Sequence, residues 1–178
     1  MAHLGEQLFD GIGNNGAVRS SDLALLPARA SLGATMLYHG LDKVHPARRA
    51  HAADQFHQMG IRPGSFWSVA TGVAETIAGV SMLAGMFTRP AALAVLVTQA
   101  VAIRKVHAPK GFAITKGGYE FNVALMAIAA GVLLAGPGRL SLHAAIERSV
   151  EPRGVRLFER IFGRRPRNAA TRLLWLLG

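Results

Sequence analysis

The sequence predicts an all-α integral membrane protein, a four-helix bundle of two antiparallel hairpins followed by an amphipathic basic C-terminal tail. The first observation is composition: 51% of the 178 residues are hydrophobic, yet 20 Lys and Arg against 10 Asp and Glu give a formal net charge of +10. The second is segregation, because the charges gather between apolar windows, whereas a soluble domain usually intersperses them. The third is length, since four windows approach the roughly 20 apolar residues that cross a bilayer. They cover about residues 23–41, 66–86, 90–108 and 119–135.

A soluble helical bundle whose core helices are apolar on every side is the competing interpretation. We favour the membrane because the second and fourth windows leave no polar face for water. The chain then divides into a polar N-terminal arm at 1–22, a four-helix transmembrane domain at 23–142 and a basic amphipathic tail at 143–178.

The N-terminal arm does not resemble a cleaved signal. It contains Glu6, Asp10 and Asp22 but only Arg19 as a cation, so the basic start of a signal peptide is missing. We therefore expect the first helix to remain in the mature protein.

The connections between the windows differ in length. Residues 42–65 form a long loop with four cations and three histidines, and residues 109–118 form a second, lysine-bearing loop. Between the two hairpins, "FTRP" is a tight turn that ends one helix and places a proline at the start of the next.

Charge does not divide the two ends of the bundle cleanly. The end with the first and third loops carries eight Lys and Arg, whereas Arg19, Arg89 and the tail lie at the other end. We expect a multi-pass protein of the cell membrane with both termini in the cytoplasm.

The chain contains nine arginines from Arg139 onward, with apolar residues between them near a helical period. Such a segment suits contact with anionic lipid headgroups. Nucleic acid is the competing partner for a basic tail, and we expect none because the apolar windows and the lack of a known nucleic-acid-binding motif oppose it.

The sequence contains no cysteine, which excludes thiol–quinone electron transfer by this chain, thiolate zinc sites, iron–sulfur ligation and disulfides. We expect no metal site either, because the available histidines and glutamates lie on different elements without a ligand spacing. Whether the chain is an enzyme at all is left open.

Five segments occur in order between about residues 23 and 142: "YHGLDKV", "FHQMGI", "VAETIAGVSMLAGMFTRPAAL", "VHAPKGF" and "GGYEFNVALMAIAAGVLLAGPGRLSL". Together they resemble the DoxX family of small four-helix membrane proteins. The resemblance implies association with redox complexes, as for small archaeal subunits of quinone-linked sulfur oxidation. It implies no established catalytic residues, so candidate sites must come from the sequence itself.

Polar residues of three windows are expected at one depth near one end of the bundle, where they could bind a quinone or a similar amphiphile. We call these six residues the predicted polar layer: Tyr38, His39, Arg104, His107, Tyr119 and Glu120.

Glu120 is the acidic member of this layer. A carboxylate facing lipid is costly, so we expect it to point into the bundle toward Arg104 or one of the two histidines. The alternative is a cap at the start of the fourth helix, where the helix dipole favours an acidic residue. Small residues are also expected to mark helix contacts, namely Gly72, Gly79, Ala127 and Gly131.

Glu75 falls near the middle of the second window, where ionised side chains are rare and usually paired or functional. We expect Arg29 to pair with it and Gln99 to complete an intramembrane polar network. The network could be a buried pair that fixes helix register or a relay toward the predicted polar layer.

Three function classes follow. The chain could be a redox-associated membrane subunit that binds a quinone non-covalently, a noncatalytic scaffold of a larger complex, or a small transporter. Electrons would have to come from a partner subunit, because the sequence shows no cofactor-ligand motif. The expected partners are the lipid bilayer and other membrane or membrane-associated proteins.

Overall fold

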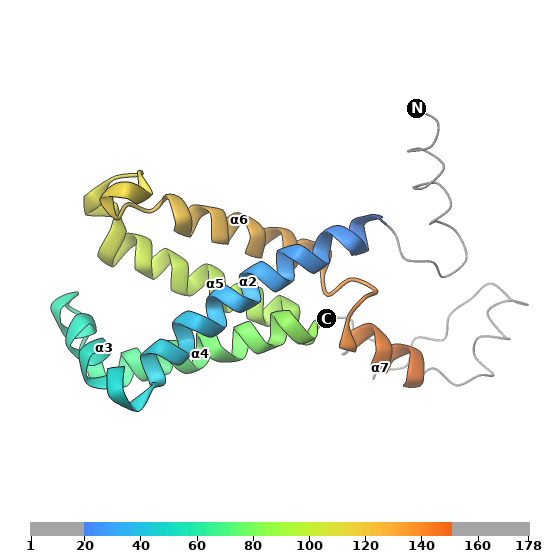
Figure 1. Cartoon of the computed structure of the whole chain (residues 1–178), viewed down its shortest axis with the longest axis horizontal. Helices are drawn as coiled ribbons and strands as arrows, with labels where there is room; N and C mark the ends of the chain where they lie inside the picture. The colour runs from blue at the N-terminus through green and yellow to red at the C-terminus, as the bar shows by residue number, and fades with distance from the viewer. Residues whose placement is uncertain (1–19, 151–178) are drawn as a thin grey trace, which may run out of the picture.

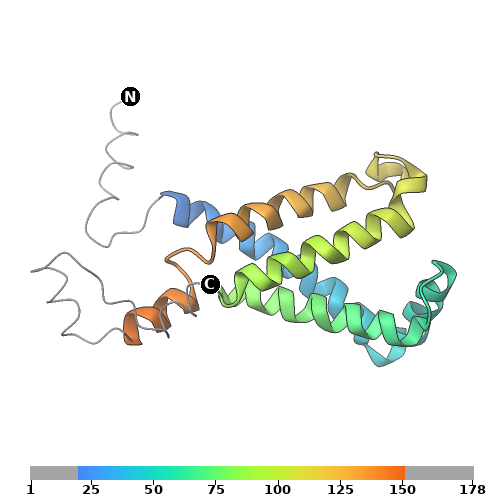
Figure 2. The same cartoon turned by 180° about the vertical axis from the view of Figure 1, so that it is seen from behind.

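The computed structural model describes residues 20–150, and every element in that range is helical. The parts of the N-terminal arm and the tail at 1–19 and 151–178 lie outside the described residues. Four long helices lie alongside one another, as the two opposite views show (Figures 1 and 2). They are α2 (Ser20–Val44), α4 (Gly64–Ala84), α5 (Thr88–Ala102) and α6 (Glu120–Ala135).

Each predicted window coincides with one of these helices. Two segments, Gly64–Ala84 and Thr88–Lys110, are long and apolar enough to cross a membrane by length and composition. The second segment includes a π-helical turn at Ile103–His107 and a short 3-10 turn at Ala108–Lys110. α6 is apolar but has 16 residues, so the crossing of α2 and α6 stays a prediction.

The long first loop contains a helix that the sequence interpretation missed, α3 (Pro46–Gln58). Pro46 occupies its first turn, and the His45 Nδ1 accepts a hydrogen bond from the Ala47 amide at 3.3 Å. Proline at this position and a capping side chain before it are both helix-start signals. α3 and the segment 103–119 lie at one end of the molecule, and α7 (Leu142–Val150) lies at the other (Figure 1).

α2 and α4 approach most closely where glycines face each other. A Cβ on Gly79 would lie 2.6 Å from the Leu37 nitrogen and 2.8 Å from the Gly33 oxygen. A Cβ on Gly72 would lie 3.1 Å from the Gly40 oxygen. The prediction that Gly72 and Gly79 face protein is therefore confirmed, because only glycine allows this backbone approach.

The same prediction is wrong for α6. Ala127 and Gly131 are exposed, and nothing lies within 4 Å of a Cβ built on Gly131. The buried face of α6 is formed instead by Asn122, Leu125, Ala129 and Val132. A series of small residues identifies one face of a helix, but it does not indicate whether another helix of the same chain packs on that face.

The core consists of apolar residues from all four long helices, among them Leu32, Met36, Met82, Val95 and Leu125. The outward faces are apolar as well. Large hydrophobic side chains are exposed along α4 and α5: Val73, Ile77, Val80, Leu93, Val97 and Val101. An apolar exterior of this kind suits contact with lipid or with a partner protein.

Candidate functional site

A largely buried ion pair joins α2 to α4. The Lys43 Nζ lies 2.7 Å from the Glu75 Oε2 and also donates to the His39 carbonyl oxygen at 3.2 Å. Lys43 comes from the last turn of α2, and Glu75 comes from the middle of α4. The side chain of Glu75 is 6% exposed and that of Lys43 is 22% exposed. The ion pair is therefore largely buried in the protein, with only Lys43 partly exposed.

The expected pairing of Arg29 with Glu75 is wrong. The Arg29 side chain, which comes from α2, lies beside the C-terminal end of α4. A Cβ on Gly85 would lie 2.7 Å from the Arg29 Nη1. Gly85 is ten residues beyond Glu75, which corresponds to about 15 Å along a helix. The prediction started α2 at residue 23 and α4 at residue 66, whereas the helices extend further and pack in a shifted register.

Arg29 instead fixes the chain that follows α6. Its guanidinium donates to the Pro137 carbonyl oxygen and, at 2.9 Å, to the Leu140 carbonyl oxygen. Asp22, also from α2 and buried, accepts a hydrogen bond from the Arg139 amide at 2.9 Å. Two side chains of α2 thereby hold the 137–140 segment against the bundle.

Gln99 is buried, but it does not extend the Lys43–Glu75 pair. Its Oε1 accepts from the Asn122 Nδ2 at 2.7 Å, and its Nε2 points to the Met36 sulfur at 3.9 Å. Counted from the turn between α4 and α5, Glu75 and Gln99 lie at comparable depths, about 15–18 Å along their helices. Two of the polar contacts between helices in the described part of the chain are therefore separate from each other, one joining α2 to α4 and one joining α5 to α6 and α2.

The predicted polar layer does occupy one end of the molecule, but its members bond locally. The His107 Nδ1 lies 2.7 Å from the Gly117 carbonyl oxygen, and the Tyr119 ring packs on Phe112 with centroids 5.5 Å apart. The Tyr38 ring contacts its neighbour His39 at 5.5 Å.

Among the described residues, no hydrogen bond, ion pair or ring contact joins Tyr38 or His39 to His107, Tyr119 or Glu120. Arg104 is exposed on the π-helical turn. The geometry therefore places these six residues at one end without assembling them into a site.

The expectation that Glu120 points into the bundle is wrong. Glu120 is exposed, is the first residue of α6, and accepts a hydrogen bond from the Ile114 amide at 2.9 Å. The carboxylate therefore fastens the 111–119 loop to the start of α6. It lies in the first turn, where the helix dipole favours an acidic residue, but no side chain caps α6 by a hydrogen bond.

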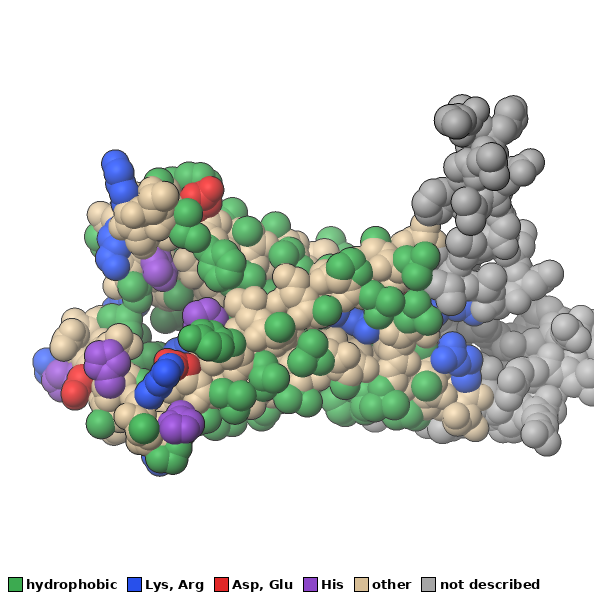
Figure 3. Space-filling view, in the orientation of Figure 1, with side chains coloured by type: hydrophobic (Ala, Val, Ile, Leu, Met, Phe, Trp, Pro, Cys, Tyr) green, Lys and Arg blue, Asp and Glu red, His purple; other side chains and the backbone are tan. Residues whose placement is uncertain are grey.

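The hairpins separate toward the end that carries α3 and the 103–119 segment. Figure 3 shows a hollow between these two parts, with histidine, lysine and arginine side chains around it. No group of three His, Asp or Glu residues within 20–150 is arranged to hold a metal ion.

Sequence reasoning missed Lys43 as the partner of Glu75, because residue 43 was assigned to a loop. The available signal was that Lys43 follows His39 by four residues. On a helix this spacing places both side chains on one face, which would extend α2 past its predicted end. It also missed the buried Asn122 as the partner of Gln99. The two residues of that pair are 23 apart in sequence and come from different helices, so no local pattern signals the contact.

A family model described as DoxX matches residues 24–108. Over these residues the chain belongs to the DoxX family. It is accordingly a membrane protein of the DoxX type, with apolar helices of the length that such a protein requires. No curated protein and no solved structure matches it.

The matched region of this DoxX protein runs from α2 through the π-helical turn. It includes Lys43, Glu75 and Gln99. Asn122 and Glu120 lie beyond it, so the last motif of the resemblance, "GGYEFNVAL", falls outside the matched residues.

Proposed function

We propose that this DoxX protein is a noncatalytic membrane subunit of a larger, redox-associated complex, in which it serves as a helical scaffold. The observation that carries the proposal is that two pairs of interior polar side chains bond to each other across helices. Lys43 with Glu75 and Gln99 with Asn122 each join two helices. Groups bonded in this way stabilise the arrangement of the helices and leave the chemistry to partner subunits.

The exterior supports the same proposal. Ile77 on α4 and Val97 on α5 belong to exposed apolar faces, and the exposed face of α6 carries the small residues Ala127 and Gly131 together with Leu134. Small residues allow another membrane helix to approach closely. The α6 face is thus the surface on which we expect a partner helix to pack.

A photo-crosslinking residue at position 127 in native membranes tests this expectation, with position 97 on α5 as the matched control. We expect one discrete crosslinked product from position 127 and a band of higher mass on a blue-native gel. A chain that migrates alone and gives only lipid adducts from both positions would contradict the scaffold role.

A second candidate function is the binding of a quinone or another amphiphile at the Lys43–Glu75 pair. One observation favours it: an ion pair in the middle of a membrane helix is rare and marks a functional site by default. Lys43 is also partly exposed, so a carbonyl-bearing headgroup could approach its ammonium.

Quinone retained by the purified protein tests this second function. We expect Lys43→Met to lower retention and Glu120→Gln to leave it unchanged, because Glu120 binds only its own loop. Equal retention in both variants would leave the scaffold role alone. Substrate uptake into proteoliposomes would instead favour the small transporter.

The topology belongs to the same proposal. Four membrane crossings place both termini on one side, and we propose the cytoplasm, with the arginine-rich tail on anionic headgroups. Reporter fusions at residues 1 and 178 test the side. Activity of a periplasmic reporter at either end would contradict it.

A further inference from the structure

We propose that the pocket between α3 and the start of α4 binds the phosphate of a membrane phospholipid headgroup. The pocket has a volume of about 520 Å³, and its polar lining comes from Asp54, His57, Arg62 and Ser65. We call it the α3–α4 pocket. None of its residues belongs to the polar contacts of the proposed function.

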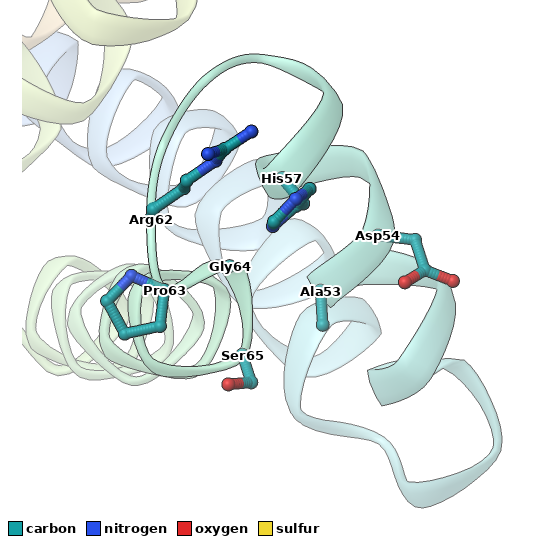
Figure 4. A pocket seen from close by; sticks show the side chains of 7 residues that line it. All are labelled: Ala53, Asp54, His57, Arg62, Pro63, Gly64 and Ser65. Carbon is teal, nitrogen blue, oxygen red and sulfur yellow. The ribbon is translucent and has the colours of Figure 1, made fainter.

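The pocket exists because α3 folds back closely onto α4. A Cβ on Gly64 would lie 2.2 Å from the Ala53 carbonyl oxygen and 2.9 Å from the His57 nitrogen. Gly64 therefore allows the last turns of α3 to contact the first turn of α4. The concave surface above this contact carries the side chains of His57 and Arg62 (Figure 4).

The basic groups of the pocket are available to a ligand. Figure 4 shows the Arg62 side chain extending into the space between the loop and α3, on the side where the His57 ring lies, while the Asp54 carboxylate points away from both. Within the described part of the chain, neither basic side chain hydrogen-bonds to another residue. The planar fork of an arginine matches the oxygens of a phosphate, and an imidazole N–H supplies a second donor.

Two aromatic residues place the pocket at the level of the headgroups. Phe66 and Trp67, in the first turn of α4, are 59% and 46% exposed, and their rings contact edge to face at 5.2 Å. Tryptophan, with its amphipathic ring, is enriched at the boundary between hydrocarbon and headgroups, so Trp67 marks this level. The apolar segment of α4 that is long enough to cross a membrane begins at Gly64, which places Asp54, His57 and Arg62 just outside the hydrocarbon.

The same arrangement favours a lipid over free phosphate. A phospholipid can present its phosphate to Arg62 while its acyl chains lie along the exposed rings of Phe66 and Trp67. Free phosphate would use only the basic groups. Further cations on and beside α3, including Arg48 and Arg49, add to the attraction of an anionic leaflet.

The experiment uses the full chain in nanodiscs with Trp67 as the reporter. A Trp175→Phe background leaves Trp67 as the one tryptophan of the sequence. Quenching of Trp67 fluorescence is measured twice in discs that contain both phosphatidylglycerol and phosphatidylcholine. In the first measurement the phosphatidylglycerol carries the bromine label, and in the second the phosphatidylcholine carries it. We expect several-fold preferential quenching by the anionic lipid, and Arg62→Gln to reduce that preference about fivefold.

Two variants separate the pocket from general surface charge. Arg49→Gln removes the same charge from the same end without altering the pocket, and should reduce the preference much less than Arg62→Gln. Asp54→Asn removes the acidic group from the lining and should increase the preference. Equal effects of Arg49→Gln and Arg62→Gln would overturn the proposal.

A competition arm separates the two sources of phosphate. Soluble glycerol phosphate at millimolar concentration should leave the quenching unchanged, because it lacks the acyl contacts. Displacement by glycerol phosphate would overturn the lipid assignment, and so would the absence of any preference in the unsubstituted pocket. Neither result would bear on the scaffold role, which depends on other residues.

Discussion

The ammonium group of Lys43 at the end of α2 lies 2.7 Å from the carboxylate of Glu75 in the middle of α4. The contact sits beside the close approach of Gly40 and Gly72, where a Cβ on Gly72 would lie 2.8 Å from the Lys43 Cβ. The glycines bring the helices together, and the ion pair fixes their register. Neither residue can lose its partner without leaving a charge in a largely apolar interface.

The first prediction tests this pair by a double-mutant cycle. Lys43→Met and Glu75→Leu should each lower the free energy of unfolding in detergent, near the lower end of about 3–5 kcal/mol because Lys43 is partly exposed. The double replacement should cost less than the sum of the singles.

The matched control is Arg48→Met, which breaks the exposed ion pair of Arg48 with Asp42. It should cost less than about 1 kcal/mol. Additive losses at positions 43 and 75 would mean that the contact contributes nothing to register.

The second prediction concerns Arg29 at the opposite end of the bundle. Arg29→Met should lower stability by about 2–3 kcal/mol and increase hydrogen exchange at residues 137–142, because two carbonyl oxygens lose a charged donor. Arg29→Lys should restore only part of the protection, since a single ammonium does not reproduce the two-pronged contact. Full protection in Arg29→Met would show that α7 is held by other contacts.

The third prediction compares two glycines with opposite surroundings. Gly79→Ala should destabilise the α2–α4 contact, because its Cβ would lie 2.6 Å from backbone of α2. Gly131→Ala should stabilise the isolated protein by about 0.5–1 kcal/mol, because the site is open and alanine favours a helix.

Thermal unfolding in detergent measures both glycine variants. In native membranes, the Gly131→Ala and Gly131→Leu variants should weaken assembly in that order if a partner helix packs on this face. An unchanged assembly with leucine at 131 would argue that lipid covers it.

The fourth prediction concerns Glu120. Glu120→Gln should cost little, since the amide oxygen can still accept from the Ile114 N–H, whereas Glu120→Ala should cost about 1 kcal/mol. Proteolysis of the 111–119 loop should increase only in the alanine variant. Equal losses in both variants would indicate that the charge of Glu120, rather than its hydrogen bond, is what matters.

The sequence by itself determined the four long helices and the family, but not α3. Apolar windows, separated by charged loops and ended by glycine and proline, locate α2, α4, α5 and α6 within a few residues, because a bilayer-sized helix is defined by local composition. The same local signals placed Gly72 and Gly79 at a helix contact. The motif order also identified the DoxX family.

The tertiary structure alone decided which side chains meet. Glu75 pairs with Lys43 rather than with Arg29. Glu120 accepts a hydrogen bond from the Ile114 amide rather than facing the histidines. Counting residues along separate helices gives depth only to within a turn or two, and a shift of one turn moves a side chain by about 5.4 Å. That shift exceeds the reach of a hydrogen bond, so the register set by packed glycines selects the partners, and no pattern within a single helix contains that information.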